Sequence, residues 1–248
     1  VIKHQKQGGD RCIIIETGFI KRAHYYSLSF DSFVGWGNYG KIDENNSTRL
    51  KPLELDSVTI SHKKSKRGHI LVCGQLPWDT VNRHIDYLDW MRGTLNKLTE
   101  LTNRKIIFRH HPNIRRGKTT LDIVNSESGV LAKHRTGPGF KKLHDYINSQ
   151  ENIEYSNNMS LQDDFNNAHC ILAYNSTTLI DGLLYGLPFF AFNEASMIYT
   201  RGNNKLKNIE NPKFPDKESV KKTLNRISFC QWNIEEIKKG LPFKQLIK

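Results

Sequence analysis

Long apolar runs and paired cysteines are what this sequence lacks most clearly. None of the apolar runs in its 248 residues approaches the roughly 20 residues that a membrane-spanning helix needs. Its four cysteines stand singly, at Cys12, Cys73, Cys170 and Cys230, and three of them lie in or beside strand-like apolar runs. This usage favours buried, reduced thiols over a disulfide framework or a zinc site, so we expect a cytoplasmic protein.

Common phosphate-binding loops are also missing from the predicted strand–helix units. The sequence has no G-x-x-x-x-G-K-[ST], and its G-x-G-x-x-G match, GWGNYG at 35–40, does not lie between a predicted strand and a predicted helix. The first loop cradles phosphates in P-loop NTPases, and the second holds the pyrophosphate of dinucleotides. An ATPase or a dehydrogenase would therefore lack its usual phosphate cradle, and a nucleotide would have to be held in another way.

Basic residues outnumber acidic ones. The 37 Lys and Arg against 25 Asp and Glu give a net charge of +12 and a pI of about 9.5. The excess is clustered at Lys63, Lys64, Lys66, Arg67, Arg115, Arg116, Lys118, Lys133, Arg135, Lys141 and Lys142. Such clusters favour a polyanionic partner, whether nucleic acid, an anionic glycan or a membrane surface. Ordinary solvated loops would have the same composition, so both interpretations stay open.

Apolar runs alternate with amphipathic stretches through most of the chain. Strands are predicted at residues 11–17, 69–74, 105–110, 152–156, 170–175 and 188–192, and helices at 84–102, 140–149, 160–168 and 177–185. This alternation predicts an α/β fold with a parallel sheet covered on both faces, a Rossmann-like domain. We expect this domain to span 67–215, after an N-terminal region, 1–66, that is too short for a second Rossmann domain. Residues 216–248 are expected to add C-terminal helices, the second beginning at Trp232.

Polar residues follow three of the predicted strands at their carboxyl ends, where parallel sheets bind ligands. These ends carry Gly74 and Gln75, then Arg109, His110 and His111, then Asn175, Ser176, Thr177 and Thr178. The glycine allows close backbone approach, while Arg109 and His111 supply positive donors for phosphate oxygens. The strand–turn–helix at 170–185 directs a positive helix end at the same kind of anion, and Asp181 within it could reach a ribose. Each end alone is compatible with a turn or a plain βαβ unit, but together they predict a nucleotide-like ligand.

Five short motifs extend this pattern along the chain. GQLPWD (74–79) resembles a Gly-Gln-x-Pro-x-Asp loop of phage and bacterial glycosyltransferase-like proteins. RHHPN (109–113) and NSTT (175–178) are similar to the His-Pro and Ser/Thr motifs of capsule-type glycosyltransferases and bacterial sialyltransferases. Residues 15–40 resemble a Glu-x-Gly, tyrosine-rich segment of the same group, and 229–240 resemble its Gln-Trp-x-x-x-Glu-Ile ending. The resemblance implies a GT-B-like fold with a small or reduced N-terminal half. The group has Gly-Leu-Asn-Gly where this chain reads VGWGNYG.

The resemblance also implies a role for each matching residue. Arg109 and His111 would neutralise the donor phosphate as its bond to the sugar breaks. Gly74, Gln75, Ser176, Thr177 and Thr178 would complete the donor site, and Asp181 would bind the ribose. Glu16 would be the general base that deprotonates the acceptor hydroxyl. With Arg and His carrying the charge no metal is required, and the nucleotide-sugar is a co-substrate, so no cofactor is expected.

The residues around Glu16 support this role and also leave alternatives. Glu16 ends the apolar strand CIIIE, where partial burial would raise its pKa toward a useful value. A carboxylate paired with Lys21 or Arg22 is the structural alternative, and Asp31 is the rival base. The nearby aromatic residues form either a core or a stacking platform for a sugar ring or an extruded base. They are Tyr25, Tyr26, Phe30, Phe33, Trp36 and Tyr39.

Together these expectations predict a metal-independent glycosyltransferase with a nucleotide-sugar donor, expected to be UDP-linked. The basic clusters and the lack of a long apolar run favour DNA as the acceptor, specifically a hydroxymethylated pyrimidine in phage DNA within the host cytoplasm. The first alternative is a capsule or lipopolysaccharide glycosyltransferase, for which a CMP-linked sugar is the expected donor. The second is a non-catalytic nucleic-acid-binding module on a Rossmann-like scaffold. The oligomeric state stays open.

Overall fold

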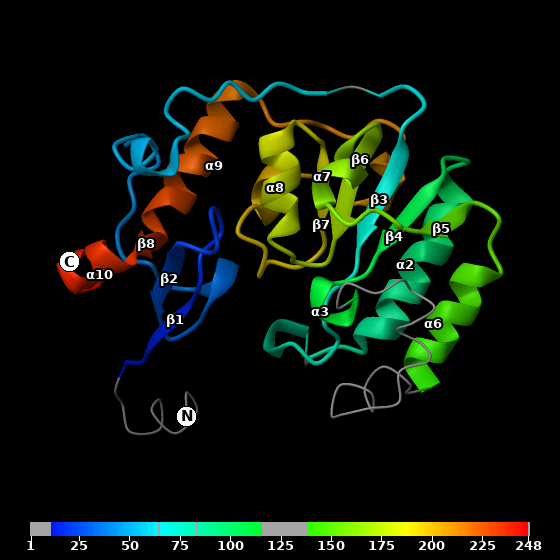
Figure 1. Cartoon of the computed structure of the whole chain (residues 1–248), viewed down its shortest axis with the longest axis horizontal. Coiled ribbons are helices and arrows are strands. Elements are labelled where there is room, and N and C mark those ends of the chain that lie inside the picture. Colours follow the sequence, from blue (N-terminus) through cyan, green and yellow to red (C-terminus); the bar gives the residue numbers. More distant parts are fainter. Residues whose placement is uncertain (1–10, 64, 83, 116–137, 248) are drawn as a thin grey trace. The chain divides into compact units, whose positions relative to one another are not determined.

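The computed structural model describes residues 11–63, 65–82, 84–115 and 138–247 (Figure 1). The chain divides into two compact units. Unit 1 consists of Val1–Ser61, Asn193–Gly202 and Pro215–Lys248, and unit 2 consists of His62–Phe192 and Asn203–Phe214. The chain therefore crosses between the units more than once.

Unit 2 is built on a five-stranded parallel sheet with the strand order β5-β4-β3-β6-β7 (Figure 1). Its strands are β3 (His69–Cys73), β4 (Ile106–Arg109), β5 (Ile153–Tyr155), β6 (Ala168–Ala173) and β7 (Phe189–Ala191). The chain adds β4 and β5 on one side of β3 and then returns to place β6 on the other side. The boundary between β3 and β6 is therefore the topological switch point, where parallel α/β sheets open a crevice for ligands.

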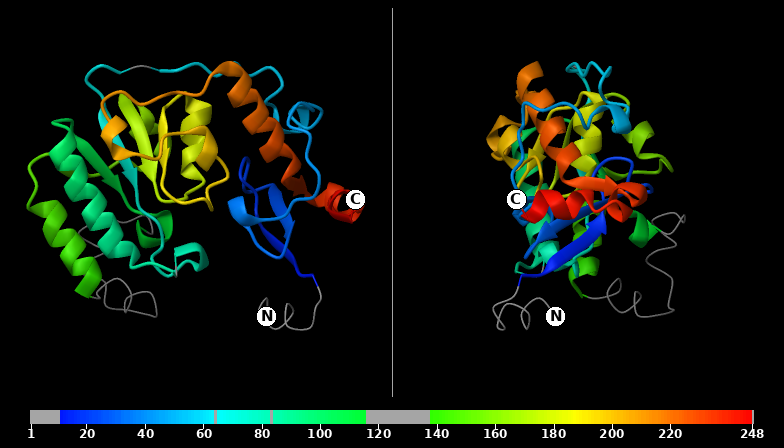
Figure 2. Two further views of the ribbon diagram at one scale, coloured as in Figure 1. Left: turned by 180° about the vertical axis from the view of Figure 1, so that it is seen from behind. Right: turned by 90° about the vertical axis from the view of Figure 1, so that its left-hand side faces the viewer.

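Helices cover both faces of this sheet. On one face α2 (Tyr87–Leu101) and α6 (Pro138–Asn148) lie side by side (Figure 2) and share a buried apolar cluster with Cys170 and Leu172 of β6. Ile171, between those two residues, points to the opposite face, where α8 (Thr178–Tyr185) packs. A Cβ on Gly182 of α8 would lie 2.6 Å from Cγ2 of Ile171, so this glycine permits the close approach of α8 to β6.

The remaining helices among the described residues of unit 2 are short. They are α3 (Pro112–Arg115), α7 (Leu161–Phe165), η3 (Thr80–Asn82) and η5 (Leu206–Asn208). Side chains cap the helix starts: Asp86 accepts from the N–H of Asp89 in α2, and Ser160 accepts from that of Gln162 in α7. Gly186 ends α8 with a φ of 94°, a conformation that favours glycine. Every strand and helix predicted between residues 69 and 192 is present, with bounds shifted by a few residues.

Unit 1 is built on a three-stranded antiparallel sheet with the order β1-β2-β8. Its strands are β1 (Ile13–Thr17), β2 (Tyr25–Phe30) and β8 (Gln231–Asn233). Leu28 and Phe30 of β2 share a buried cluster with Trp232 and Leu246. The prediction that a helix begins at Trp232 is therefore wrong, because this residue lies in a strand whose partner is more than 200 positions earlier in the sequence.

Three helices complete the C-terminal segment of unit 1. They are α9 (Lys217–Phe229), α10 (Ile234–Lys238) and α11 (Leu241–Ile247). The short 3₁₀ helices of this unit are η1 (Val34–Trp36), η2 (Lys51–Leu53) and η4 (Tyr199–Arg201). Among the helices described in both units, none is long and apolar enough to cross a bilayer.

Polar side chains fasten the C-terminal segment to the N-terminal one within unit 1. The guanidinium of Arg49 lies 3.8 Å above the ring of Trp232 and donates to both carboxylate oxygens of Glu236, at 2.9 and 3.1 Å. Oε1 of Gln231 accepts the backbone N–H groups of residues 19 and 20 at 2.7 and 2.9 Å. The Gln-Trp-x-x-x-Glu-Ile segment that carried part of the resemblance therefore has a structural role.

Candidate functional site

The three polar strand ends that the sequence singled out are neighbours in the sheet of unit 2. Strands β4, β3 and β6 are consecutive in the sheet order and run in the same direction. Their polar continuations, around Gly74, His111 and Asn175, therefore meet at the carboxyl edge of the sheet. This edge includes the switch point between β3 and β6, the usual ligand position in such sheets.

Gln75 and Asn175 connect the ends of β3 and β6 across the switch point. The backbone N–H of Asn175 donates to Oε1 of Gln75 at 2.9 Å, and Nε2 of Gln75 donates to Oδ1 of Asn175. The backbone N–H of Gln75 donates to the hydroxyl of Tyr87 at 2.8 Å. Both amide residues are buried. Gln75 was predicted to contact the nucleotide-sugar. In the structure, both ends of its amide bind Asn175.

Ser176 caps the start of α8. Its Oγ accepts hydrogen bonds from the backbone N–H of Thr178 at 3.2 Å and from the Thr178 hydroxyl at 2.9 Å. Because both acceptor positions of Oγ are filled, the O–H of Ser176 remains as a donor. Thr177 occupies the N-cap position without a side-chain capping bond. The predicted Ser/Thr residues therefore lie where the positive end of the helix dipole begins.

His111 follows β4 and enters the turn into α3. Its Nδ1 accepts the backbone N–H of Asn113 at 3.1 Å. In the neutral ring the proton must then be on Nε2, so the hydrogen bond fixes the tautomer. The side chain is half-buried. His111 can therefore present an N–H at the edge where it was predicted to act.

Arg109 is engaged differently from the prediction. Its guanidinium is buried and forms an ion pair with Asp164, which is only 1% exposed. It also donates to Oγ of Ser156 at 3.1 Å and to the carbonyls of Asn158 and Met159 at 2.8 and 2.9 Å. The positive charge is thus neutralised within the protein. The sequence did not anticipate this buried carboxylate partner, which follows β5, and the role of Arg109 toward a donor phosphate stays a prediction.

Gly74 and Asp181 also have surroundings that the prediction did not anticipate. A Cβ on Gly74 would lie 3.0 Å from the ring of Phe108, so the glycine makes room for the neighbouring strand. Asp181 lines a surface hollow of about 330 Å³ between α7 and α8. The other residues around that hollow are Leu161, Gln162, Phe165, Leu184 and Tyr185. None of the strand-end residues lines this hollow, so the hollow does not bring Asp181 together with them.

The predicted base Glu16 lies in unit 1 on β1, which is at the edge of the three-stranded sheet. Glu16 is exposed, and the adjacent Ile15 is 55% exposed. The expectation that Glu16 is partly buried is therefore wrong, because CIIIE forms an edge strand. Lys21, one of the alternative partners of Glu16, instead pairs with Glu54 at 2.7 Å.

The rival base Asp31 ends β2 in a left-handed conformation, with a φ of 63°. Its Oδ1 accepts the backbone N–H of Cys12 at 3.0 Å, and its Oδ2 lies 3.3 Å from Nε of Arg11. These contacts hold the start of the N-terminal strand against the end of β2. They give the Asp31 carboxylate a structural role.

The aromatic segment is divided between core and surface, so the core alternative applies to part of it, and the stacking platform stays a prediction for the rest. The buried members are Tyr25, Phe30 and Tyr39. Tyr26 and Trp36 are 39% and 41% exposed, and Phe33 is intermediate. Only the exposed pair offers ring surface on which a sugar or a base could stack.

The predicted basic clusters are described only in part. Lys64, Arg116, Lys118, Lys133 and Arg135 lie outside the described residues, and of Arg115 only the backbone in α3 is described. Lys63, Lys66 and Arg67 are exposed on unit 2, with the ammonium of Lys63 3.5 Å above the ring of Tyr185. Lys141 and Lys142 are exposed on α6, and Lys141 pairs with Asp145. A basic surface near residues 63–67 is therefore present.

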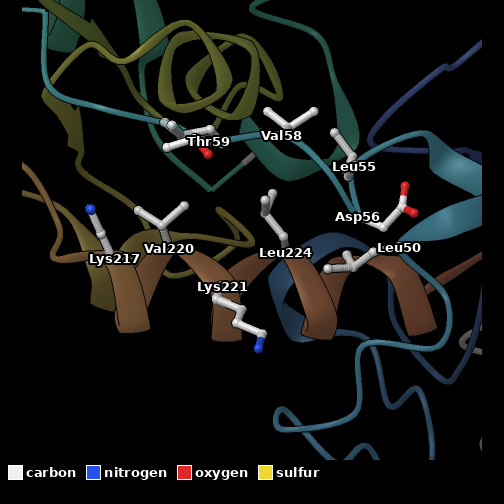
Figure 3. A pocket seen from close by; sticks show the side chains of 10 residues that line it. Leu50, Leu55, Asp56, Val58, Thr59, Lys217, Val220, Lys221 and Leu224 are labelled. Atoms are coloured by element: carbon white, nitrogen blue, oxygen red, sulfur yellow. The ribbon is translucent and has the colours of Figure 1, made fainter.

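Sequence reasoning did not anticipate a hollow of about 290 Å³ in unit 1 (Figure 3). Leucine and valine side chains from residues 50–60 and from α9 face one another across it, and Lys217 and Lys221 also lie along α9 (Figure 3). Its two walls are far apart in the sequence, so no local pattern indicates it. Among the described residues, no group of three or more His, Cys, Asp or Glu is arranged to hold a metal ion.

No family model and no curated protein sequence matches this chain. Its fold is similar to that of Thermosulfurimonas dismutans KpsC, β-Kdo 2,4 transferase, with a TM-score of 0.53 and 13% identity over 97% of this chain and 82% of that one. The β-Kdo 2,7 transferase of the same KpsC gives a TM-score of 0.46 at 13% identity, covering 95% and 77%. Methanocaldococcus jannaschii UDP-GlcNAc 2-epimerase, in complex with UDP-GlcNAc and UDP, gives 0.36 at 16% identity, covering 74% and 49%.

These findings define the class of fold. The five-stranded Rossmann-like unit and the similarity to the 2,4 transferase establish a GT-B-like α/β fold, with a small second unit where the sequence predicted a reduced N-terminal half. The resemblance to capsule-type glycosyltransferases is thereby confirmed at the level of the fold.

Proposed function

We propose that the protein is a glycosyltransferase that binds a nucleotide-sugar at the carboxyl edge of the unit 2 sheet. The observation that carries this proposal is the polar cluster at the switch point of a GT-B-like fold. There the Gln75–Asn175 bridge, the Ser176 hydroxyl and the fixed tautomer of His111 accompany the start of α8. Hydrogen-bond donors and a helix N-terminus suit the phosphate of an activated sugar.

The proposed chemistry is direct displacement at the anomeric carbon of the sugar. The acceptor hydroxyl oxygen forms the new bond, the bond from the sugar to the donor phosphate breaks, and the phosphate leaves with the electron pair. Nε2–H of His111 and the O–H of Ser176 stabilise the negative charge on the leaving phosphate. Glu16 takes the proton of the acceptor hydroxyl as general base. Its exposure is compatible with access to an acceptor.

For the acceptor we propose an acidic glycan of the capsule or lipopolysaccharide type. The similar 2,4 transferase is described as a β-Kdo transferase of KpsC. A net charge of +12 favours any polyanionic acceptor. A CMP-linked sugar is then the expected donor.

Duplex DNA that carries hydroxymethylated pyrimidines is the second candidate acceptor, with a UDP-linked donor. The specific observation that favours it is the exposed basic surface at Lys63, Lys66 and Arg67. Binding through phosphate neutralisation would weaken steeply as salt is raised. Transfer of a sugar to hydroxymethylated duplex DNA, but not to an acidic oligosaccharide, would favour this candidate over the glycan.

The donor is tested first, with a panel of CMP-, UDP- and GDP-sugars in thermal unfolding and calorimetry. A ligand that binds only the folded state stabilises it by about 2.7 kcal/mol at a hundredfold excess over its Kd. We expect one nucleotide class to raise the melting temperature and then to support transfer to one of the two acceptors. Failure of every nucleotide-sugar to bind would contradict the proposal. If the protein binds a ligand but transfers no sugar, and if Glu16→Gln and His111→Ala leave that binding unchanged, the result would instead favour the non-catalytic module.

A further inference from the structure

The orientation of the Gln75 amide is fixed by the backbone. Its oxygen must be the atom that faces Asn175, because the group it meets there is a backbone N–H, at 2.9 Å. A backbone N–H is always a donor. Nε2 of Gln75 must then be the atom that meets the side chain of Asn175. Exchange of the two Gln75 amide atoms would place a donor against a donor.

The orientation of the Asn175 amide follows from that of Gln75. Since Nε2 of Gln75 donates, the atom it meets must be Oδ1 of Asn175, which leaves Nδ2 directed away from Gln75. Nδ2 is buried and has no hydrogen-bond partner among the described residues. Asn175 as a whole is only 7% exposed. A buried amide donor without a partner is costly, and such groups call for a specific explanation.

Ser176, the next residue, also has its acceptor atom satisfied within the protein and a donor left over. Its Oγ already accepts two hydrogen bonds from Thr178, so what it can still offer is its O–H. Asn175 and Ser176 therefore follow β6 with acceptors satisfied inside the protein and with donors left over. They stand just before α8, whose N-terminus adds positive potential. Consecutive donors beside a helix N-terminus select an anionic oxygen and disfavour a cation.

We propose that Nδ2 of Asn175 donates a hydrogen bond to a phosphate oxygen of the nucleotide-sugar, and that Gln75 is the positioning residue that holds the amide in this orientation. This inference rests on the proposed function and deepens it. It gives Asn175 the direct contact with the nucleotide-sugar, where the sequence predicted a contact by Gln75. A ligand phosphate oxygen supplies the acceptor that Nδ2 lacks in the protein alone.

The first test replaces the donor with an acceptor of the same shape. In Asn175→Asp, Oδ1 still accepts from Gln75, while an oxygen with negative charge replaces Nδ2. We expect the Kd of CMP, UDP or GDP, whichever the wild type binds, to rise roughly tenfold or more, because a hydrogen bond to a charged group is lost. The Kd of the matching nucleoside, which has no phosphate, should stay within about twofold. Asn96→Asp, which adds the same charge at an exposed position of α2, is the matched control and should change neither Kd.

The second test reverses the orientation of the Asn175 side-chain amide through a substitution at position 75 alone. In Gln75→Glu, one carboxylate oxygen still accepts the backbone N–H of Asn175, but the other cannot donate to Oδ1. The Asn175 amide then turns to donate Nδ2 to the carboxylate, so Oδ1 faces the ligand instead. Both internal hydrogen bonds survive, and the variant should fold. Its nucleotide Kd should nevertheless rise as in Asn175→Asp, which a purely structural role for Gln75 would not produce.

The outcomes separate the two proposals. If the wild type binds no nucleotide from the panel, the proposed function fails and this inference fails with it. If the wild type binds a nucleotide and folded Asn175→Asp or folded Gln75→Glu binds it equally well, only the inference about Asn175 is overturned. An equal rise in the Kd of the nucleoside would also overturn it, because the contact would then not be to phosphate. A selective loss of phosphate affinity in both variants supports it.

Discussion

The guanidinium of Arg109 and the carboxylate of Asp164 form a buried ion pair that joins the end of β4 to α7 in unit 2. Asp164 also accepts hydrogen bonds from Ser156 and from Nδ2 of Asn158. The segment after β5 and the start of α7 therefore converge on one charge. The pair therefore stabilises the end of β4, which His111 follows.

Asp164→Ala should lower the free energy of unfolding by about 3–5 kcal/mol, because it leaves the Arg109 charge buried and uncompensated. Urea denaturation followed by circular dichroism measures the change. Asp145→Ala is the control, since it breaks an exposed i,i+4 pair with Lys141 and should cost about 0.5 kcal/mol or less. Equal losses in the two variants would contradict the assignment of a buried pair.

Ser176→Ala should weaken nucleotide binding as well as the start of α8. Loss of its capping bond should cost about 1 kcal/mol of stability, and loss of its O–H about tenfold in affinity. Ser160→Ala is closely matched, because Ser160 caps α7 through the same contact to the second residue ahead. It should lose similar stability and no affinity. If Ser160→Ala weakens nucleotide binding equally, the effect comes from stability alone.

Glu16→Gln should lower kcat by 10²-fold or more if Glu16 is the general base, with little change in KM. The substitution should leave stability nearly unchanged, because Glu16 is exposed on an edge strand. Glu54→Gln, which alters the exposed partner of Lys21, is the control and should retain full activity. Asp31→Asn should also remain active, since asparagine tolerates the left-handed conformation at this position. A fully active Glu16→Gln enzyme would rule out the assigned base.

Stability should fall as the pH drops below about 6.5. Burial lowers the pKa of His144, whose Nδ1 contacts the hydroxyl of Tyr155 at 2.6 Å, and burial also lowers the pKa of His69. The unfolded chain therefore takes up protons in a pH window where the folded protein does not, from about 6.5 down through the lowered values. Urea midpoints at pH 7.5, 6.5 and 5.5 should decrease in that order. The decrease should be smaller in His144→Gln, and an identical pH profile for this variant would contradict the assignment.

The sequence was sufficient to predict unit 2 because its signals are local. Each parallel strand is a short apolar run, and each helix has its own period and cap, so neighbouring residues determine the element. The apolar run CIIIE correctly predicted a strand but not the exposure of Glu16, because such a run does not reveal that its strand lies at a sheet edge. The ion pair of Arg109 could not be predicted, because its partner, Asp164, lies 55 positions later, where the local sequence indicates only a helix start. The sequence placed Asn175 at the start of the NSTT motif but could not give the orientation of its amide, because that depends on Gln75, 100 positions earlier.

The central strand of unit 1 has a consequence for biosynthesis. Residues 25–27 pair with 231–233, so this sheet cannot close until residue 233 has left the ribosome. The strands of the parallel sheet end at residue 191 and the last segment of unit 2 ends at Phe214, so unit 2 can be complete while β2 still waits for its neighbour. During that interval β1 and β2 form at most a lone hairpin, which is marginal in water. Vectorial folding therefore begins with unit 2, and unit 1 is finished last.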